Sequence, residues 1–165
     1  MTQLITQQRL KELLRYDSET GVFHWLVNRG KNGTKNKLAG SRLTEGYLVI
    51  TIDGRSYIAH RLAWLYVYGV WPTSGLDHIN RVHDDNRITN LREATCAQNM
   101  QNRNSLSNNK SGVVGVSWNK RINKWSASIK VSYKTIRLGN FSSIEHAAIA
   151  RAEAKAKYHT FHPKD

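Results

Sequence analysis

The hydrophobic pattern of the first 27 residues predicts a short helix followed by a strand. After Thr6, whose hydroxyl can cap a helix, apolar residues recur at helical spacing at Leu10, Leu13 and Leu14. We expect this helix to end near Tyr16-Asp17, and the Thr20-Gly21 turn to lead into a strand at 22–27. Residues 28–37 contain no apolar residue and four positive charges, which predicts an exposed loop or a flexible arm that contacts phosphates.

The pattern at 46–70 predicts a hairpin followed by a buried helix. Two β-rich runs flank Asp53-Gly54, a strong hairpin-turn signal. The apolar and aromatic run 60–70 is typical of a mostly buried helix, which Gly69 and Pro72 would end. His60, at the start of this helix, has two interpretations: contact with a substrate, or a structural role in the core.

The last third predicts a small sheet with one helix. The polar stretch 102–110 has no period and reads as a linker. Three runs with strand character follow, at 113–118, 125–131 and 135–138, and a hydroxyl at Ser142 or Ser143 then precedes an alanine-rich helix that runs to about Tyr158.

Between these parts lies a segment that predicts a strand, a second strand and a helix. The strands are expected at 76–80 and 90–94, and the connection between them contains turn-forming Asp and Asn residues. Thr95 and Gln98 fit a capping box, so a helix beginning there would carry Asn99 in its first turn or just beyond. Folded together, this unit can bring four side chains into one place: Asp77, His78, Asn90 and Asn99. The predicted fold class is α+β.

The amino-acid composition predicts that the protein binds a polyanion. The 165 residues include 25 Lys+Arg and 12 Asp+Glu, which gives a formal charge of +13 and a pI near 10.1. Such a charge favours nucleic acid, or less often an anionic membrane surface. It is divided unevenly, with +5 in residues 1–76, +1 in 77–110 and +7 in 111–165. The near-neutral middle suggests that carboxylates are kept there for a purpose, although local scatter would give the same pattern.

The remaining composition sets the class of protein. A hydrophobic content of 39% is enough for a packed core and excludes a largely disordered chain. The single cysteine, Cys96, argues for a reducing cytoplasm and against a cysteine-rich zinc site. No apolar run approaches about 18 residues and the first residues lack a signal-peptide core, so we expect a soluble, cytoplasmic protein without a membrane partner.

The four convergent residues suit metal-assisted phosphodiester hydrolysis. Asp77 and the amide oxygen of Asn99 are the hard ligands that Mg²⁺ prefers. His78, with an ordinary pKa of about 6.5, can take a proton from the attacking water. Asn90 would fix the orientation of the histidine by a hydrogen bond across the hairpin. Each residue taken singly also has an ordinary structural interpretation, and it is the ordered set that is specific.

The run DHINRVHDDNRITNLREATCAQN resembles the core of HNH nucleases, in the phage and homing-endonuclease branch with a His-Asn-Asn pattern. The resemblance implies that His78 is the general base, that Asn90 is the asparagine before a leucine, and that Asp77 and Asn99 are the metal ligands. It also implies that Asn86 shapes the loop. With HRLAW and YDSETGVFHW, the resemblance covers most of residues 10–104. Asparagine at 99, where many HNH enzymes have histidine, suits Mg²⁺ or Mn²⁺ better than Zn²⁺.

The segments SGVVGVSW, NKWSASI, IRLGNF and SIEHAAIARAEA resemble the APETALA2/ERF DNA-binding domain. That family has a three-stranded antiparallel sheet packed on one helix, and its sheet lies in the major groove of DNA. The candidate DNA contacts are Trp118, Lys120, Arg121, Lys124, Trp125, Lys130 and Arg137. Among these, Trp125 is expected to be partly structural, and Arg121 and Arg137 to contact DNA. Arg137 stands where the family usually has tryptophan, so base preference does not carry over.

The two resemblances together imply a magnesium- or manganese-dependent DNA endonuclease with a phage-like module order, acting in the cytoplasm of a bacterial host. The expected organisation is an HNH module at 1–104 with its ββα-metal core at about 76–103, a linker at 105–110 and the DNA-binding domain at 111–161. A single active site nicks naturally, which favours a monomer. The alternative is a non-catalytic DNA-binding regulator that keeps the nuclease fold; RNA binding fits the charge but explains neither the acids nor the asparagines.

Overall fold

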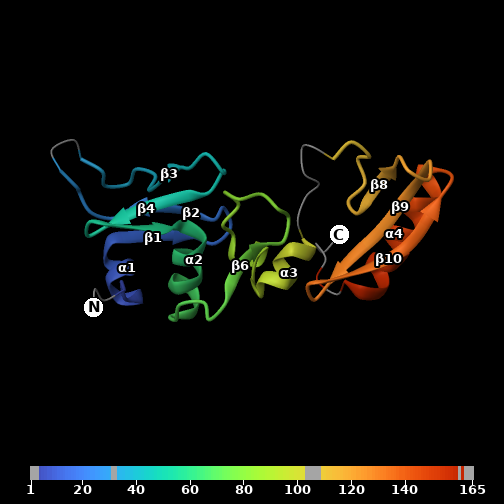
Figure 1. Cartoon of the computed structure of the whole chain (residues 1–165). Coiled ribbons are helices and arrows are strands. Elements are labelled where there is room, and N and C mark those ends of the chain that lie inside the picture. Colours follow the sequence, from blue (N-terminus) through green and yellow to red (C-terminus); the bar gives the residue numbers. More distant parts are fainter. Residues whose placement is uncertain (1–3, 31–32, 103–108, 160, 162–165) are drawn as a thin grey trace. The chain divides into compact units, whose positions relative to one another are not determined.

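The computed structural model describes residues 4–30, 33–102, 109–159 and 161. Contacts divide the chain into two compact units, Met1–Thr95 and Cys96–Asp165, and each is described by itself (Figure 1). Within the described residues, none of the helices combines the length and hydrophobicity needed to cross a lipid bilayer.

The first unit opens with helix α1, Gln7–Leu13, which is capped by the Thr6 hydroxyl accepting from the Arg9 N–H at 3.2 Å. The predicted start is confirmed, but the predicted end is wrong. Leu14–Asp17 forms strand β1, which pairs antiparallel with β2, Val22–Trp25. Burial alternates along β1, with Leu14 and Tyr16 buried. Pairing with β2 outweighs the helical spacing of the leucines because it buries both side chains on one face.

The second sheet contains the expected hairpin. Its strands are β3, Ser41–Arg42, β4, Leu48–Ile52, and β5, Arg55–Ile58, in the order β3-β4-β5. Asp53 and Gly54 join β4 to β5 with φ angles of 47° and 77°, the two positive values of a tight hairpin turn. Helix α2, Ala59–Tyr68, follows β5 and ends at Gly69 in the left-handed conformation, as predicted.

One apolar core joins these elements. In Figure 1, α1 and α2 lie side by side against the strands of this unit. The residues at its centre are at most 2% exposed; they include Leu10, Leu14, Phe23, Ile50, Leu62 and Leu65. Strand β6, Gly75–His78, pairs antiparallel with β7, Leu91–Ala94, after the 3-10 turn Ile88–Asn90, so both predicted strands are confirmed. Leu91 belongs to the core and fixes this two-stranded ribbon to it.

The second unit contains helix α3, Cys96–Gln101, and a sheet of β8, Val116–Asn119, β9, Lys124–Val131, and β10, Lys134–Phe141. All pairs are antiparallel, in the order β10-β9-β8. Helix α4, Ile144–Tyr158, is capped by Ser143 and packs its alanines on the sheet. The predicted sheet and helix are therefore present. Most of the predicted linker, 105–108, lies outside the described residues.

The α+β class is confirmed by these small antiparallel sheets and their helices. The two strands of the expected ββα core belong to the first unit, whereas α3 groups with the second. The ββα-metal arrangement and the module boundaries therefore stay predictions.

We predict that Gly21→Ala destabilises the first unit by more than about 2 kcal/mol. Gly21 has φ +73°, and a Cβ there would lie 2.6 Å from the Asn86 carbonyl carbon and would also overlap the Arg87 nitrogen. Urea unfolding followed through NMR signals of α2 measures the change.

Gly54→Ala is the matched control, because Gly54 has φ +77° with nothing within 4 Å of the added carbon. Gly54→Ala should lower the free energy of unfolding by only about 1 kcal/mol, the cost of placing alanine at a positive φ angle. Equal losses in the two variants would contradict the close packing of Gly21 under the 86–87 backbone.

Candidate functional site

His78 ends strand β6 and is buried, with 4% of its surface exposed. Its Nε2 lies 3.1 Å from Oδ1 of Asn86, which is itself only 1% exposed. Because an amide oxygen only accepts, Nε2 carries the hydrogen in this arrangement, and Nδ1 carries the lone pair. The pair therefore fixes both the orientation and the tautomer of the ring.

Asn86 is held in turn by the first hairpin. The Tyr16 hydroxyl donates to the Asn86 carbonyl at 2.7 Å, and burial raises the pKa of Tyr16 to about 12, so the hydroxyl stays protonated as a donor. The backbone of Gly21 also packs against residues 86–87. Asn86 Nδ2 is buried and has no hydrogen-bond partner among the described residues. Residues far apart in the sequence thus build one support behind His78.

Asn90 stabilises the loop between the two strands. Its Nδ2 donates to Asn80 Oδ1 at 2.9 Å and to the Asp85 carbonyl at 2.8 Å, and its Oδ1 accepts from the Asn80 N–H at 3.0 Å. The Asn90 carbonyl accepts from the Ile79 N–H, next to His78. Asn90 was expected to orient the histidine ring and Asn86 to shape the loop. In the structure Asn86 accepts the hydrogen bond from the ring, and Asn90 holds the loop and the backbone beside the histidine.

Asp77 forms a buried ion pair that the sequence analysis did not predict. It lies opposite Arg92 in the β6–β7 register, and its Oδ2 accepts from Arg92 Nε at 3.0 Å and Nη2 at 2.9 Å. The Asp77 side chain is 6% exposed and that of Arg92 is 20% exposed. Consecutive strand residues face opposite sides, so Asp77 and His78 project to different faces of the ribbon. The hairpin register was the signal that could have paired Asp77 with Arg92.

The structure places Asp77 and His78 in β6 and Asn90 in the turn directly before β7, with Asp77 and His78 on opposite faces of the ribbon. Asn99 is an exposed residue of α3 in the second unit, and its carbonyl accepts from the Asn102 N–H at 3.2 Å. Within the described part of the chain, no group of three or more His, Cys, Asp or Glu residues could hold a metal ion. Any metal held by these residues would rely on amide oxygens as well as on Asp77.

Two further histidines and a tyrosine surround the His78 ring. The His60 ring meets it edge-on, with centroids 4.9 Å apart, and the rings of Tyr47 and His83 lie 5.9 Å and 6.0 Å away. Burial, with a smaller contribution from the neighbouring His78, lowers the pKa of His60 to about 3. Burial also lowers the pKa of His78, against the opposing effect of the Asn86 hydrogen bond. Both rings are therefore neutral at pH 7.

His60 is 7% exposed, and its Nδ1 is buried with no hydrogen-bond partner in the described part of the chain. Of its two interpretations, the geometry favours a side chain packed within the protein against His78. Sequence reasoning placed His60 at a helix start but had no signal for its contact with His78, because α2 and β6 meet only in the folded chain.

The strand register of the second unit separates the seven candidate DNA contacts. Trp125 alternates with the buried Ala127 and Ile129, so it faces α4, and it packs in the small core of this unit. Trp118 pairs with Trp125 on that same face, with ring centroids 5.2 Å apart. The opposite face is open and polar.

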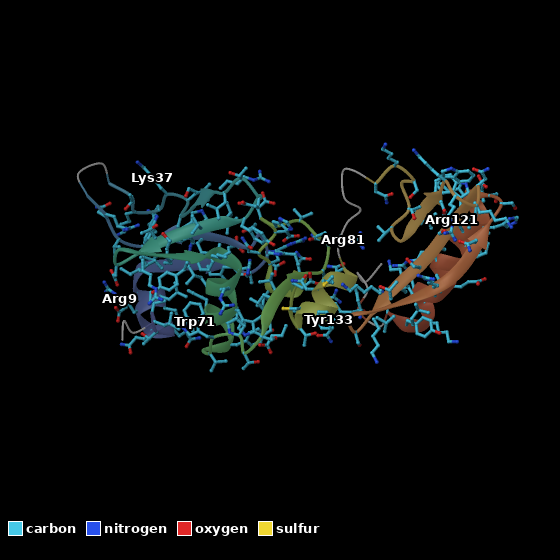
Figure 2. The ribbon with its side chains drawn as sticks, viewed as in Figure 1. Arg9, Lys37, Trp71, Arg81, Arg121 and Tyr133 are labelled. Atoms are coloured by element: carbon cyan, nitrogen blue, oxygen red, sulfur yellow. The ribbon has the colours of Figure 1, made fainter. Side chains whose placement is uncertain are left out.

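On that open face the basic side chains Lys124, Lys130 and Arg137 are exposed. They are interspersed with short polar residues at Ser117, Ser126, Ser128 and Asn140. Lys120 and Arg121 lie in the exposed turn between β8 and β9; Figure 2 shows Arg121 and Tyr133 at opposite ends of β9.

Comparison of the chain with known protein families identifies the segment that contains the His78–Asn86 pair. Residues 57–101 match the family model described as HNH endonuclease. This HNH segment, residues 57–101, includes every position named above on β6, on β7 and in the loop between them, and also Asn99. It supports an HNH nuclease, which at the family level is a DNA-cleaving hydrolase. Searches of curated proteins and of solved structures returned no match.

We predict that the stability of the first unit falls on acidification because of His60. Its folded pKa of about 3 lies below the ordinary value of 6.5, so between these pH values the unfolded chain binds a proton that the folded chain does not. The free energy of unfolding should therefore fall by up to about 1.4 kcal/mol per pH unit below pH 6.5, or about 2 to 3 kcal/mol by pH 4.5.

Urea unfolding of α2, followed by NMR at pH 7, 5.5 and 4.5, measures this slope. His60→Gln should flatten it, whereas His146→Gln, at an exposed position of α4, should leave it unchanged. A slope in His60→Gln as steep as in the wild type would show that other groups carry the pH dependence.

Proposed function

We propose that the chain is a metal-dependent DNA endonuclease that hydrolyses phosphodiester bonds and is targeted to duplex DNA by its C-terminal domain. One observation carries the proposal: within the HNH segment, the buried His78 is held through Nε2 by the equally buried Asn86, which fixes the ring and its tautomer. This is the arrangement that a general base needs.

His78 acts on the water. With Nε2 donating to Asn86, Nδ1 is the ring nitrogen that takes the proton from the attacking water molecule. The buried support from Tyr16 and Asn86 holds the ring in place during attack, which removes part of the entropic cost of the reaction. As the family resemblance implies, hydrolysis would leave a 5′-phosphate and a 3′-hydroxyl.

Asp77 and Asn99 would hold the divalent cation. A carboxylate and an amide oxygen are hard ligands, so their chemistry fits Mg²⁺ or Mn²⁺ and not a zinc site built from thiolates. When bound, the cation would supply stabilisation of the negative charge on the phosphate and the leaving oxygen. Arg92 orients Asp77 through its two hydrogen bonds to Oδ2.

The second unit would hold the duplex. We assign it to the APETALA2/ERF-like class, and a phage or homing origin fits the order of the two modules. The open sheet face supports this assignment, because its cations stand among small hydroxyl side chains that let a strand surface approach DNA closely. Lys124, Lys130 and Arg137 lie on this face and Arg121 at its end, whereas Trp125 has a structural role.

Plasmid cleavage tests the catalytic assignment. We expect the wild-type protein to nick supercoiled DNA with Mg²⁺ or Mn²⁺ and to stop when the metal is chelated. His78→Ala should lower the rate at least about 100-fold, because general-base catalysis contributes that much or more. Asn99→Ala should also lower the rate, and added Mn²⁺ should restore part of it if a metal ligand has been lost.

His146→Gln, at an exposed position outside the HNH segment, is the control and should cut at the wild-type rate. Wild-type protein that binds duplex DNA but never cuts it would favour the DNA-binding regulator instead. Full activity in His78→Ala would remove this histidine from the mechanism.

DNA binding tests the open face. Arg121→Gln/Arg137→Gln should weaken duplex binding and reduce the slope of log K against log salt by about 2, because each phosphate contact contributes about 0.9. The matched control is Lys155→Gln/Lys157→Gln, which removes the same charge from α4. If both double variants lose affinity equally, net charge alone explains binding and the open face is not the DNA surface.

A further inference from the structure

His83 is a second histidine whose ring is fixed beside His78 and which the proposed mechanism does not yet use. It lies in the loop between β6 and β7, and its Nδ1 is 2.7 Å from the Glu45 carbonyl. Its ring stacks on Tyr47 with centroids 4.2 Å apart and an interplanar angle of 5°. One hydrogen bond and one stacked face therefore hold this side chain in a single orientation.

The Nδ1 contact determines which nitrogen is available for chemistry. A carbonyl oxygen only accepts, so Nδ1 must carry a hydrogen, and Nε2 is the nitrogen that gains or loses a proton. Among the described residues, Nε2 has no hydrogen-bond partner. His83 is half-buried, whereas His78 is buried, so His83 lies on the more solvent-accessible side of the cluster.

A cation, Arg42, lies close to His83. Arg42 approaches the same backbone, since its Nη2 and the His83 Nδ1 both lie 3.9 Å from the position of a Cβ at Gly46. The positive charge of Arg42 is partly offset by its ion pair with Asp84 at 3.1 Å. The other titratable rings at this place are His78 and Tyr47, neither of which carries a negative charge at pH 7.

The cluster does not suit a metal ion instead. The described residues contain no group of three or more His, Cys, Asp or Glu with a geometry that could hold one. The rings of His78, which is buried, and His83, which is half-buried, lie 6.0 Å apart, a separation at which both can contact one phosphate group.

We propose that His83 is a second substrate-contacting residue of the nuclease, donating a hydrogen bond from Nε2 to a non-bridging oxygen of the scissile phosphate. This inference rests on the proposed endonuclease function. In the protonated imidazolium, Nδ1 keeps its bond to Glu45 while Nε2 meets the phosphate, so the ring arrives at the substrate already oriented.

Two substitutions separate the roles of the two nitrogens. In His83→Asn the amide nitrogen stands near the position of Nδ1, so the variant can keep the bond to Glu45 but has no donor for the phosphate. In His83→Gln the amide nitrogen stands near the position of Nε2 and keeps that donor. We expect His83→Asn to lower kcat at least about tenfold, and His83→Gln to stay within about threefold of wild type.

The cleavage assays of the His83 variants distinguish an error about His83 from an error about the endonuclease function. If the wild-type protein never cuts DNA, the function fails before His83 is tested. If the wild type cuts and His83→Asn cuts as fast, or if His83→Gln is the more damaged variant, the phosphate contact is wrong and His83 serves the loop alone. His146→Asn, far from the HNH segment in sequence, is the control for the same chemical change.

NMR of the wild-type protein tests the His83 contact without relying on variants that could fail to fold. A short duplex that contains a mapped cleavage site, added in chelator, should move the His83 Nε2 NMR signal toward that of the imidazolium and leave the His146 signal unchanged. An unchanged His83 signal under saturating duplex would overturn the proposal.

Discussion

The hydrogen bond between His78 and Asn86 couples three parts of the first unit that are distant in sequence. Tyr16 brings the first hairpin to the Asn86 carbonyl, the loop presents the amide, and β6 presents the ring. All three side chains are buried. Removing any one of them would leave a buried polar atom without a hydrogen bond, which should lower the free energy of unfolding by about 1 to 3 kcal/mol. His78, the proposed general base, is therefore positioned by long-range packing and not by its own strand alone.

Local signals in the sequence were sufficient for much of the fold. Asp53-Gly54 defined a hairpin, Gly69 ended α2, and the two strands of the β6–β7 ribbon lay close to their predicted positions, because each depends on neighbouring residues. Where the structure differs from the prediction, pairing between residues distant in sequence is the cause. β1 replaced the end of a helix because β2 was available to pair with it, a choice that helical spacing at 10, 13 and 14 cannot reveal.

The candidate site shows the same limit. The residue types were readable from the sequence, but it assigned the role beside His78 to Asn90 and the loop to Asn86, and the structure exchanges these two roles. The neutral middle of the chain also has a structural explanation. Asp77, Asp84 and Asp85 each form an ion pair with an arginine, so most of its carboxylates are neutralised within the protein. Only the hairpin register makes the first of these pairs predictable.

The contacts of residues 16 and 45 determine which part of the chain must be kept if the HNH segment is transferred to another protein. The HNH segment starts at residue 57, yet Tyr16 holds the carbonyl of Asn86 and Glu45 holds the ring of His83. A chimera built by grafting residues 57–101 onto another protein would lose both supports and expose the back of the histidine cluster. The smallest transferable unit therefore includes the first two sheets as well as the HNH segment, and a new targeting domain should be joined after residue 101.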